Sequence, residues 1–182
     1  MYLDQGWLRD IVHKPSPNFN QRPQGVRPEL VVIHNISLPA GEFGTGCIES
    51  LFCNTLDCSI HESFSDLVGL AVSAHLLIDR CGLVTQFVSF DDRAWHAGVS
   101  MYQGRENCND FSIGIELEGT DDLAYTDAQY STLRQVLAVL RRHYDLADDA
   151  VVGHCDIAPE RKTDPGVAFA WGRISDVLKR SE

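Results

Sequence analysis

Residues 151–166 read VVGHCDIAPERKTDPG, and this stretch predicts a strand of the central sheet together with half of a candidate metal site. An apolar strand leads to His154, and an irregular polar loop then carries Asp164, ten residues further on. Proline disfavours the helical region for the residue before it, so Asp164 is expected to be extended and able to approach the same cation as His154. These two residues supply only two ligands.

Residues 30–37, LVVIHNIS, repeat the pattern, because a second apolar strand ends on a histidine, His34. Two such strands side by side would place His34 and His154 at one edge of a sheet. Two imidazoles and one carboxylate are a ligand set of catalytic zinc, which leaves the fourth position for water. Each residue alone is more often a structural strand-end histidine or a turn aspartate, so their convergence is a prediction about folding that spacing does not prove.

Length and charge narrow the class of protein. The chain has 182 residues, of which 44% are hydrophobic and 23% charged, and this fits one domain with a sizeable core. The formal net charge of −11 argues against binding to nucleic acid or to an anionic membrane, because both attract clustered Lys and Arg. An anionic ligand would need a local basic patch. Arg161 and Lys162 provide one, and Arg105 is a second candidate.

The first twenty residues contain no apolar run of signal-peptide length, and no later segment is long enough to cross a bilayer, so we expect a cytoplasmic protein. Its six cysteines are therefore expected to be free thiols. Cys53, Cys58 and His61 form a loose cluster, but the lack of an evident fourth ligand argues against a second metal site. Cys155 directly follows His154 and is expected to point into the core. No obligate protein partner is evident.

The pattern of apolar residues predicts an α/β (α+β) fold, with one domain built on a central mixed β-sheet flanked by α-helices. Residues 1–29 are rich in proline and are expected to wrap around the domain irregularly. Residues 126–144 are the clearest helix, with a capping box of Thr126 and Gln129. Further strands are expected at 71–79, 83–90 and 112–118, further helices at 47–54, 62–70 and 170–180, and a wall or lid beside His34 at 38–70.

Four side chains in these elements need separate interpretation. Glu116 and Glu118 share one face of the strand at 112–118; Glu118 is interpreted as solvated and Glu116, deeper in the strand, as a general base. Trp95, in the segment RAWHAGVS, is either a platform for a sugar ring or a buried packing residue. His75 is equally consistent with packing in the sheet and with a role in the site.

Three long motifs resemble a known family: VVIHNIS, AWHAGVSMYQGRENCNDFSIGIELEGTD and GHCDIAPERKTDPG. In order and position they resemble the zinc-dependent N-acetylmuramoyl-L-alanine amidases of cytosolic peptidoglycan recycling, within the wider amidase and peptidoglycan recognition protein superfamily. The resemblance covers nearly the whole chain and implies a mixed sheet with helices on its faces. The implied reaction is hydrolysis of the amide between the lactyl group of 1,6-anhydro-N-acetylmuramic acid and L-alanine of the stem peptide. Such enzymes also restrain β-lactamase induction in some bacteria.

The resemblance also implies roles for single residues. One zinc ion is held by His34, His154 and Asp164, and catalysis is carried out by Glu116 and Lys162. For the anhydromuropeptide substrate, Asn35 is placed near the lactyl-alanine amide, Trp95 beneath the sugar and Arg161 toward a stem-peptide carboxylate. Two positions depart from the family pattern, because Ala71 and Asn107 stand where arginines are expected, and Arg105 is close enough in sequence to compensate.

Two alternatives stay open. The chain is either an amidase or a non-catalytic muropeptide-binding module of the same fold, although all five metal and catalytic positions are filled. A cysteine hydrolase that uses Cys155 or Cys108 with a histidine is a second rival. Treatment with a chelator and with iodoacetamide during an assay separates the three.

Overall fold

A six-stranded mixed sheet forms the centre of the protein, as the computed structural model shows for residues 1–178. Its strands follow the order β12-β5-β11-β6-β7-β3. The first four run parallel, β7 is antiparallel to β6, and β3 is parallel to β7. The strands are β12 (Val151–Gly153), β5 (Leu30–Ile36), β11 (Ser112–Glu118), β6 (Leu76–Ile78), β7 (Val84–Gln86) and β3 (Val12–His13). The predicted mixed sheet with flanking helices is confirmed.

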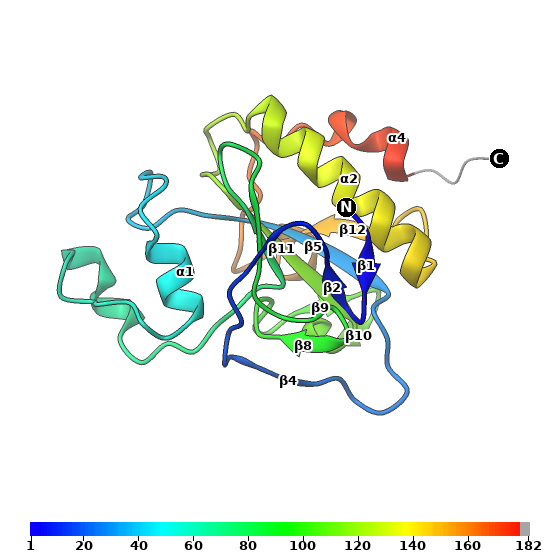
Figure 1. Cartoon of the computed structure of the whole chain (residues 1–182), viewed down its shortest axis with the longest axis horizontal. Coiled ribbons are helices and arrows are strands. Elements are labelled where there is room, and N and C mark those ends of the chain that lie inside the picture. Colours follow the sequence, from blue (N-terminus) through cyan, green and yellow to red (C-terminus); the bar gives the residue numbers. More distant parts are fainter. Residues whose placement is uncertain (179–182) are drawn as a thin grey trace.

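One face of the sheet is covered by the long helix α2 (Asp127–Tyr144), beside which α4 (Ser175–Leu178) lies (Figure 1). The predicted capping box is present, because Gln129 N donates to Thr126 Oγ1 and Thr126 N donates to Gln129 Oε1. Alternation along β11 turns its isoleucines and Leu117 toward this helix. The buried cluster between the two includes Ile113, Ile115, Leu117, Leu133, Val136, Leu137 and Leu140.

The opposite face of the sheet carries the polar residues of interest. Helix α1 (Cys47–Phe52) and the 3₁₀ helix η1 (Glu62–Leu67) lie on this side and extend to the left in Figure 1. A second buried cluster, which includes Ile48, Leu51, Phe52, Leu77 and Phe87, attaches α1 to the sheet. A third includes Leu30, Val32, Phe111, Val152 and Ile157. Side chains two residues apart along an extended chain point to the same side. His34 follows Val32 and His154 follows Val152 at this spacing, so both histidines lie on this face.

The N-terminal residues 1–29 are more regular than the predicted irregular wrap. Strand β1 (Leu3–Asp4) pairs with β2 (Trp7–Leu8), and β4 (Phe19–Gln21) pairs with β8 (Asp92–Ala94). Strand β3 adds the edge strand of the central sheet. Strands of two or three residues are too short to produce an alternating pattern of apolar and polar residues, so these N-terminal strands could not be predicted.

Several predicted elements are shorter than expected. The strands at 71–79 and 83–90 shorten to β6 and β7, which form the predicted hairpin. The helix at 62–70 is the 3₁₀ helix η1, and the helix at 170–180 divides into η3 (Trp171–Arg173) and α4, with residues 179 and 180 outside the described part. Sequence analysis did not find β9 (Met101–Tyr102), β10 (Arg105–Glu106), η2 (Cys108–Asp110) or α3 (His154–Ile157).

The cysteines are all unpaired, as predicted. Cys155 is placed differently from the prediction, because β12 ends at Gly153 and the chain then turns into α3, which leaves this thiol partly exposed rather than in the core. None of the helices described within residues 1–178 combines the length and the apolar character needed to cross a bilayer.

Candidate active site

The structure brings His34, His154 and Asp164 together at the C-terminal ends of β5 and β12. His34 Nδ1 lies 2.9 Å from His154 Nδ1, and Asp164 Oδ2 lies 3.1 Å from each of these nitrogens. Ligand atoms of a tetrahedral zinc site, each about 2.0–2.1 Å from the ion, are about 3.3 Å from one another. Both the donor set and the small triangle of donor atoms therefore fit a single divalent cation.

The electrostatics of the cluster favour the protonation states that a metal needs. Both histidines are buried, and burial lowers the pKa of His34 to about 4 although Asp164 opposes the shift. Burial acts to raise the pKa of Asp164, but the hydrogen bonds with His154 and His34 outweigh it and hold this pKa below its ordinary value. A neutral imidazole and an ionised carboxylate are the forms that coordinate metal ions.

Glu116 is the residue of β11 that pairs in register with His34 of β5. It is 8% exposed, and its Oε2 is the one buried side-chain nitrogen or oxygen within residues 1–178 that has no hydrogen-bond partner. Burial raises the pKa of Glu116 well above its ordinary value, Asp164 adds to the shift, and Lys162 opposes it. A carboxyl group with a raised pKa and an unpaired oxygen is suited to accept and release a proton.

Glu118 is buried, which corrects the prediction that it faces solvent. Its Oε1 accepts a hydrogen bond from Gly44 N at 2.5 Å and its Oε2 accepts one from Arg80 N at 3.2 Å. The loops that hold these two N–H groups cover the end of β11. Glu118 therefore joins three segments of the chain, and its role is structural.

A cavity of about 270 Å³ opens above the cluster. Glu116, Lys162 and Trp95 line it together with the three clustered residues. Its apolar wall comes from Leu38, Leu51, Phe52, Leu67 and Leu70, so residues 38–70 supply the predicted wall. A more open hollow of about 550 Å³ adjoins it and shares Asn35, Lys162 and Asp164.

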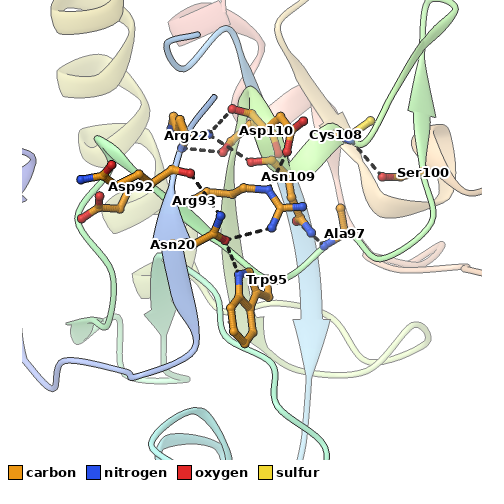
Figure 2. Close-up of polar contacts among 12 residues, drawn as sticks. Asn20, Arg22, Asp92, Arg93, Trp95, Ala97, Ser100, Cys108, Asn109 and Asp110 are labelled. Carbon is orange, nitrogen blue, oxygen red and sulfur yellow. Dashed lines mark hydrogen bonds and ion pairs between the residues drawn. The ribbon is translucent and has the colours of Figure 1, made fainter. Parts of the chain in front are cut away.

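Of the predicted substrate-binding residues, Asn35 and Trp95 line the cavity. Asn35 Nδ2 donates to Asp121 Oδ1 at 2.7 Å, which fixes the orientation of the amide. Trp95 Nε1 donates to Asn20 Oδ1 at 2.7 Å, and Arg93 donates to the same oxygen at 3.1 Å, as Figure 2 shows. The indole is thus held at its polar end while the ring remains partly exposed to the cavity.

The two predicted arginines lie in different places. Arg161 lines the more open hollow, and its Nη2 donates to the carbonyl oxygens of Ala97 and Val99 at 2.7 and 2.8 Å. Arg105 pairs with Glu29 at 2.8 Å, beside Phe111, and lines a hollow at the opposite ends of the strands. The hairpin of β9 and β10 directs Arg105 away from the cluster, so the structure does not place it to compensate for Asn107. Ala71 lines yet another hollow, beside Leu70.

Sequence analysis missed the residues that hold the clustered histidines in place. His34 Nε2 lies 2.9 Å from His96 Nδ1, and His154 Nε2 lies 3.1 Å from the carbonyl oxygen of Ala97. Asn109 Oδ1 accepts hydrogen bonds from the main-chain N–H groups of His96 and Ala97, and Figure 2 shows Asn109 next to Ala97. The available signal lies in the segment RAWHAGVS, where a histidine directly follows Trp95.

His75 belongs to the sheet rather than to the cavity. It is fully buried, and its Nδ1 accepts a hydrogen bond from Gly114 N at 3.0 Å. Arg22, which the sequence did not single out, lies beside it and donates to the carbonyl oxygens of Asp110 and Ser112. These contacts, partly visible in Figure 2, tie the N-terminal segment to the base of β11.

The thiols do not form an alternative site. Burial raises the pKa of both Cys108 and Cys155, which disfavours the nucleophilic thiolate, and neither residue lines the cavity. Within residues 1–178, only His34, His154 and Asp164 bring three metal-ligating atoms together, so the cysteine and histidine cluster near residue 58 is not assembled.

The fold and the cluster are those of a hydrolase with a candidate metal centre. The family model for N-acetylmuramoyl-L-alanine amidase matches residues 24–167. The chain is 58% identical to the 1,6-anhydro-N-acetylmuramyl-L-alanine amidase AmpD of Escherichia coli K12, over 99% of this chain and 98% of that protein. The AmpD of Enterobacter cloacae is 57% identical, over 100% of this chain and 97% of its own. A crystal structure of a selenomethionine derivative of AmpD superimposes with a TM-score of 0.95 at 55% identity, covering 98% of this chain and 100% of that one. The chain therefore belongs to the N-acetylmuramoyl-L-alanine amidase family.

Proposed function

We propose that this protein is a zinc-dependent amidase that hydrolyses the amide between the lactyl group of 1,6-anhydro-N-acetylmuramic acid and L-alanine of the stem peptide. Its high identity to proteins named for this activity, over almost their full length, supports the choice of substrate. The setting we propose is cytoplasmic peptidoglycan recycling. Removal of such muropeptides would also restrain β-lactamase induction in bacteria where they act as the inducing signal.

We assign the zinc ligands to His34, His154 and Asp164. Two neutral imidazoles and one carboxylate leave the site with a net positive charge and with a position for a further ligand. When bound, zinc supplies a Lewis acid that polarises a carbonyl group and lowers the pKa of water toward about 7.

Glu116 is the proposed general base and acid. Its unpaired Oε2 takes a proton from the attacking water as the carbon–oxygen bond forms, and it delivers that proton to the leaving amine as the carbon–nitrogen bond breaks. Burial raises the pKa of Glu116, and a carboxyl group with a raised pKa holds a transferred proton more firmly than an ordinary one. The second proton of the water leaves the newly formed carboxylic acid and is taken up by the released amine. The products are therefore the lactyl carboxylate and the ammonium group of L-alanine, and atoms and protons balance.

Lys162 is the proposed stabiliser of negative charge. It lies two residues before Asp164, lines the cavity, and acts electrostatically on both Glu116 and His34. A fixed cation beside the carbonyl oxygen that becomes negative in the tetrahedral intermediate is worth several kcal/mol. For binding, Trp95 offers an indole face to the sugar, Asn35 an amide to the lactyl-alanine group, and Arg161 a guanidinium to a stem-peptide carboxylate.

The observation that carries this proposal is the triangle of three donor atoms with the unpaired Glu116 Oε2 in the same cavity. The test is an assay of purified protein on anhydromuramyl-tripeptide, with and without a chelator, followed by addition of zinc. We expect complete loss of hydrolysis with the chelator and its return with zinc. Asp164→Ala should lower zinc affinity, measured as metal content after dialysis.

The same assay distinguishes the amidase from the two alternative functions. Binding of the tripeptide without any turnover, in zinc-loaded protein, would replace the amidase with a muropeptide-binding module. Loss of activity with iodoacetamide but not with chelator would replace it with a thiol hydrolase.

A further inference from the structure

The clustered histidines use both ring nitrogens. In each ring Nδ1 faces the triangle of donor atoms, and Nε2 faces an acceptor in the segment 96–97. We propose that His96 is a positioning residue for the metal centre, which holds His34 in the tautomer and orientation that present Nδ1 to the ion. This inference rests on the proposed zinc site.

The argument begins with the protons. A histidine that coordinates through Nδ1 must carry its single proton on Nε2, and that N–H needs an acceptor. His96 Nδ1 lies 2.9 Å from His34 Nε2 and fills this role if it carries no proton itself. The proton of His96 then sits on its own Nε2, which is 3.1 Å from Ser112 Oγ. One chain of donors and acceptors therefore runs from Ser112 to the cluster.

The position of the His96 ring is fixed from several sides. It packs edge-on against the His34 ring, with the ring centres 5.0 Å apart. Gly114 of β11 leaves the space for it, because an added Cβ there would come within 2.6 Å of His96 Nδ1. Asn109 Oδ1 holds the main-chain N–H groups of His96 and Ala97 at 3.1 and 2.8 Å. An acceptor fixed in this way restricts rotation of the His34 ring.

The neighbouring residue does the same for the other histidine. The carbonyl oxygen of Ala97 lies 3.1 Å from His154 Nε2. A main-chain carbonyl cannot be removed by substitution, whereas the side chain of His96 can. His96 is thus the part of this support that a variant can test.

The experiment compares His96→Leu with His96→Asn. Leucine and asparagine have nearly the same shape, but only asparagine carries an oxygen that can accept a hydrogen bond from His34 Nε2. Zinc dissociation constants are measured by competition with a chromogenic chelator, and thermal unfolding of each zinc-loaded variant establishes that it is folded. Because loss of an outer partner of a ligating histidine typically costs about 10-fold to 100-fold in metal affinity, we expect that loss for leucine and less than about threefold for asparagine.

A measurement on the wild-type protein needs no variant. Long-range ¹H–¹⁵N spectra of the zinc-loaded protein distinguish the protonated ring nitrogen of each histidine. We expect the proton on Nε2 of both His34 and His96. A proton on Nδ1 of His96 would overturn the proposal, since that ring could not then accept from His34.

The zinc affinities of the two variants also decide whether His96 acts as a hydrogen-bond acceptor for His34. Wild-type zinc affinity in both folded variants, or an equal loss in both, would overturn the role of the acceptor. If the wild-type protein itself bound no zinc, the proposed function would fail instead. Tight zinc binding by the wild type and by His96→Leu would leave the proposed function intact and remove only this inference.

Discussion

Glu116 and Glu118 lie two residues apart on the same face of β11, and both are buried, yet their surroundings are opposite. Each carboxylate oxygen of Glu118 accepts a main-chain hydrogen bond, whereas Glu116 Oε2 has no partner within residues 1–178. A buried polar group without a partner lowers stability, so it persists only where another requirement keeps it. Missing partners, rather than burial, distinguish the proposed general base from the structural carboxylate.

The largest effect expected from this comparison is on the rate of Glu116→Gln. Glutamine keeps the size of the side chain but cannot accept and release a proton, so we expect kcat to fall by about 10²-fold to 10⁴-fold. Zinc affinity should change by less than about threefold, because Glu116 is not a proposed ligand. Steady-state kinetics and metal analysis measure both quantities. A variant with a nearly normal kcat would remove the general-base assignment and with it the contrast to Glu118.

The second prediction concerns acid stability of the metal-free protein. Burial lowers the pKa of His34 to about 4 and also lowers the pKa of His75 and His96. Between pH 6.5 and 4 the unfolded chain therefore binds more protons than the folded one, and stability is lost as pH falls through this range. The shift of the His34 pKa alone corresponds to a loss of about 3 kcal/mol in the free energy of unfolding over this pH range.

Glu116 contributes with the opposite sign, because a raised pKa lets the folded protein keep a proton that the unfolded chain releases above about pH 4.5. Urea unfolding at a series of pH values should show the free energy of unfolding falling toward pH 4. In Glu116→Gln the fall should be steeper, since the opposing group is gone. A free energy that stays level from pH 6.5 to 4 would contradict the histidine shifts.

The third prediction reverses the effects at Glu118. In Glu118→Gln one of the two N–H groups, of Gly44 or Arg80, loses its acceptor, and we expect the free energy of unfolding to fall by about 1–3 kcal/mol. The value of kcat should change by less than about threefold. Urea unfolding and kinetics on the same preparation test this pair. Unchanged stability with a tenfold loss of kcat would show that Glu118 takes part in the chemistry.

The sequence predicted those parts of the molecule that depend on local patterns. Alternation in residues 112–118 identified the core face of β11 and drew attention to Glu116, and the capping box correctly located the start of α2. The partners of Glu118 could not be predicted, because Gly44 and Arg80 are 74 and 38 residues away in sequence. Such contacts exist only once the chain has folded.

The same reason explains the error at Arg105. Nearness to Asn107 in sequence indicated a place beside the substrate, but the turn between β9 and β10 decides the direction of the side chain. His96 was missed for a related reason, since its proposed role depends on a contact with His34, which is 62 residues away in sequence. Patterns in the sequence indicate candidate reactive groups, and tertiary contacts determine what holds them.

The smallest effect is expected for Arg105→Ala. Arg105 and its partner Glu29 have side chains 43% and 50% exposed, so their ion pair contributes between about 0 and 1 kcal/mol. The pair lies at the other ends of the strands from Glu116, and kcat/KM should change by less than about twofold. Arg161→Ala is the contrasting variant, because Arg161 lines the hollow beside Lys162, and its KM should rise more than that of Arg105→Ala. If Arg105→Ala showed the larger rise in KM, the substrate would reach the far end of the sheet. The binding site would then extend beyond the cavity around the unpaired oxygen of Glu116.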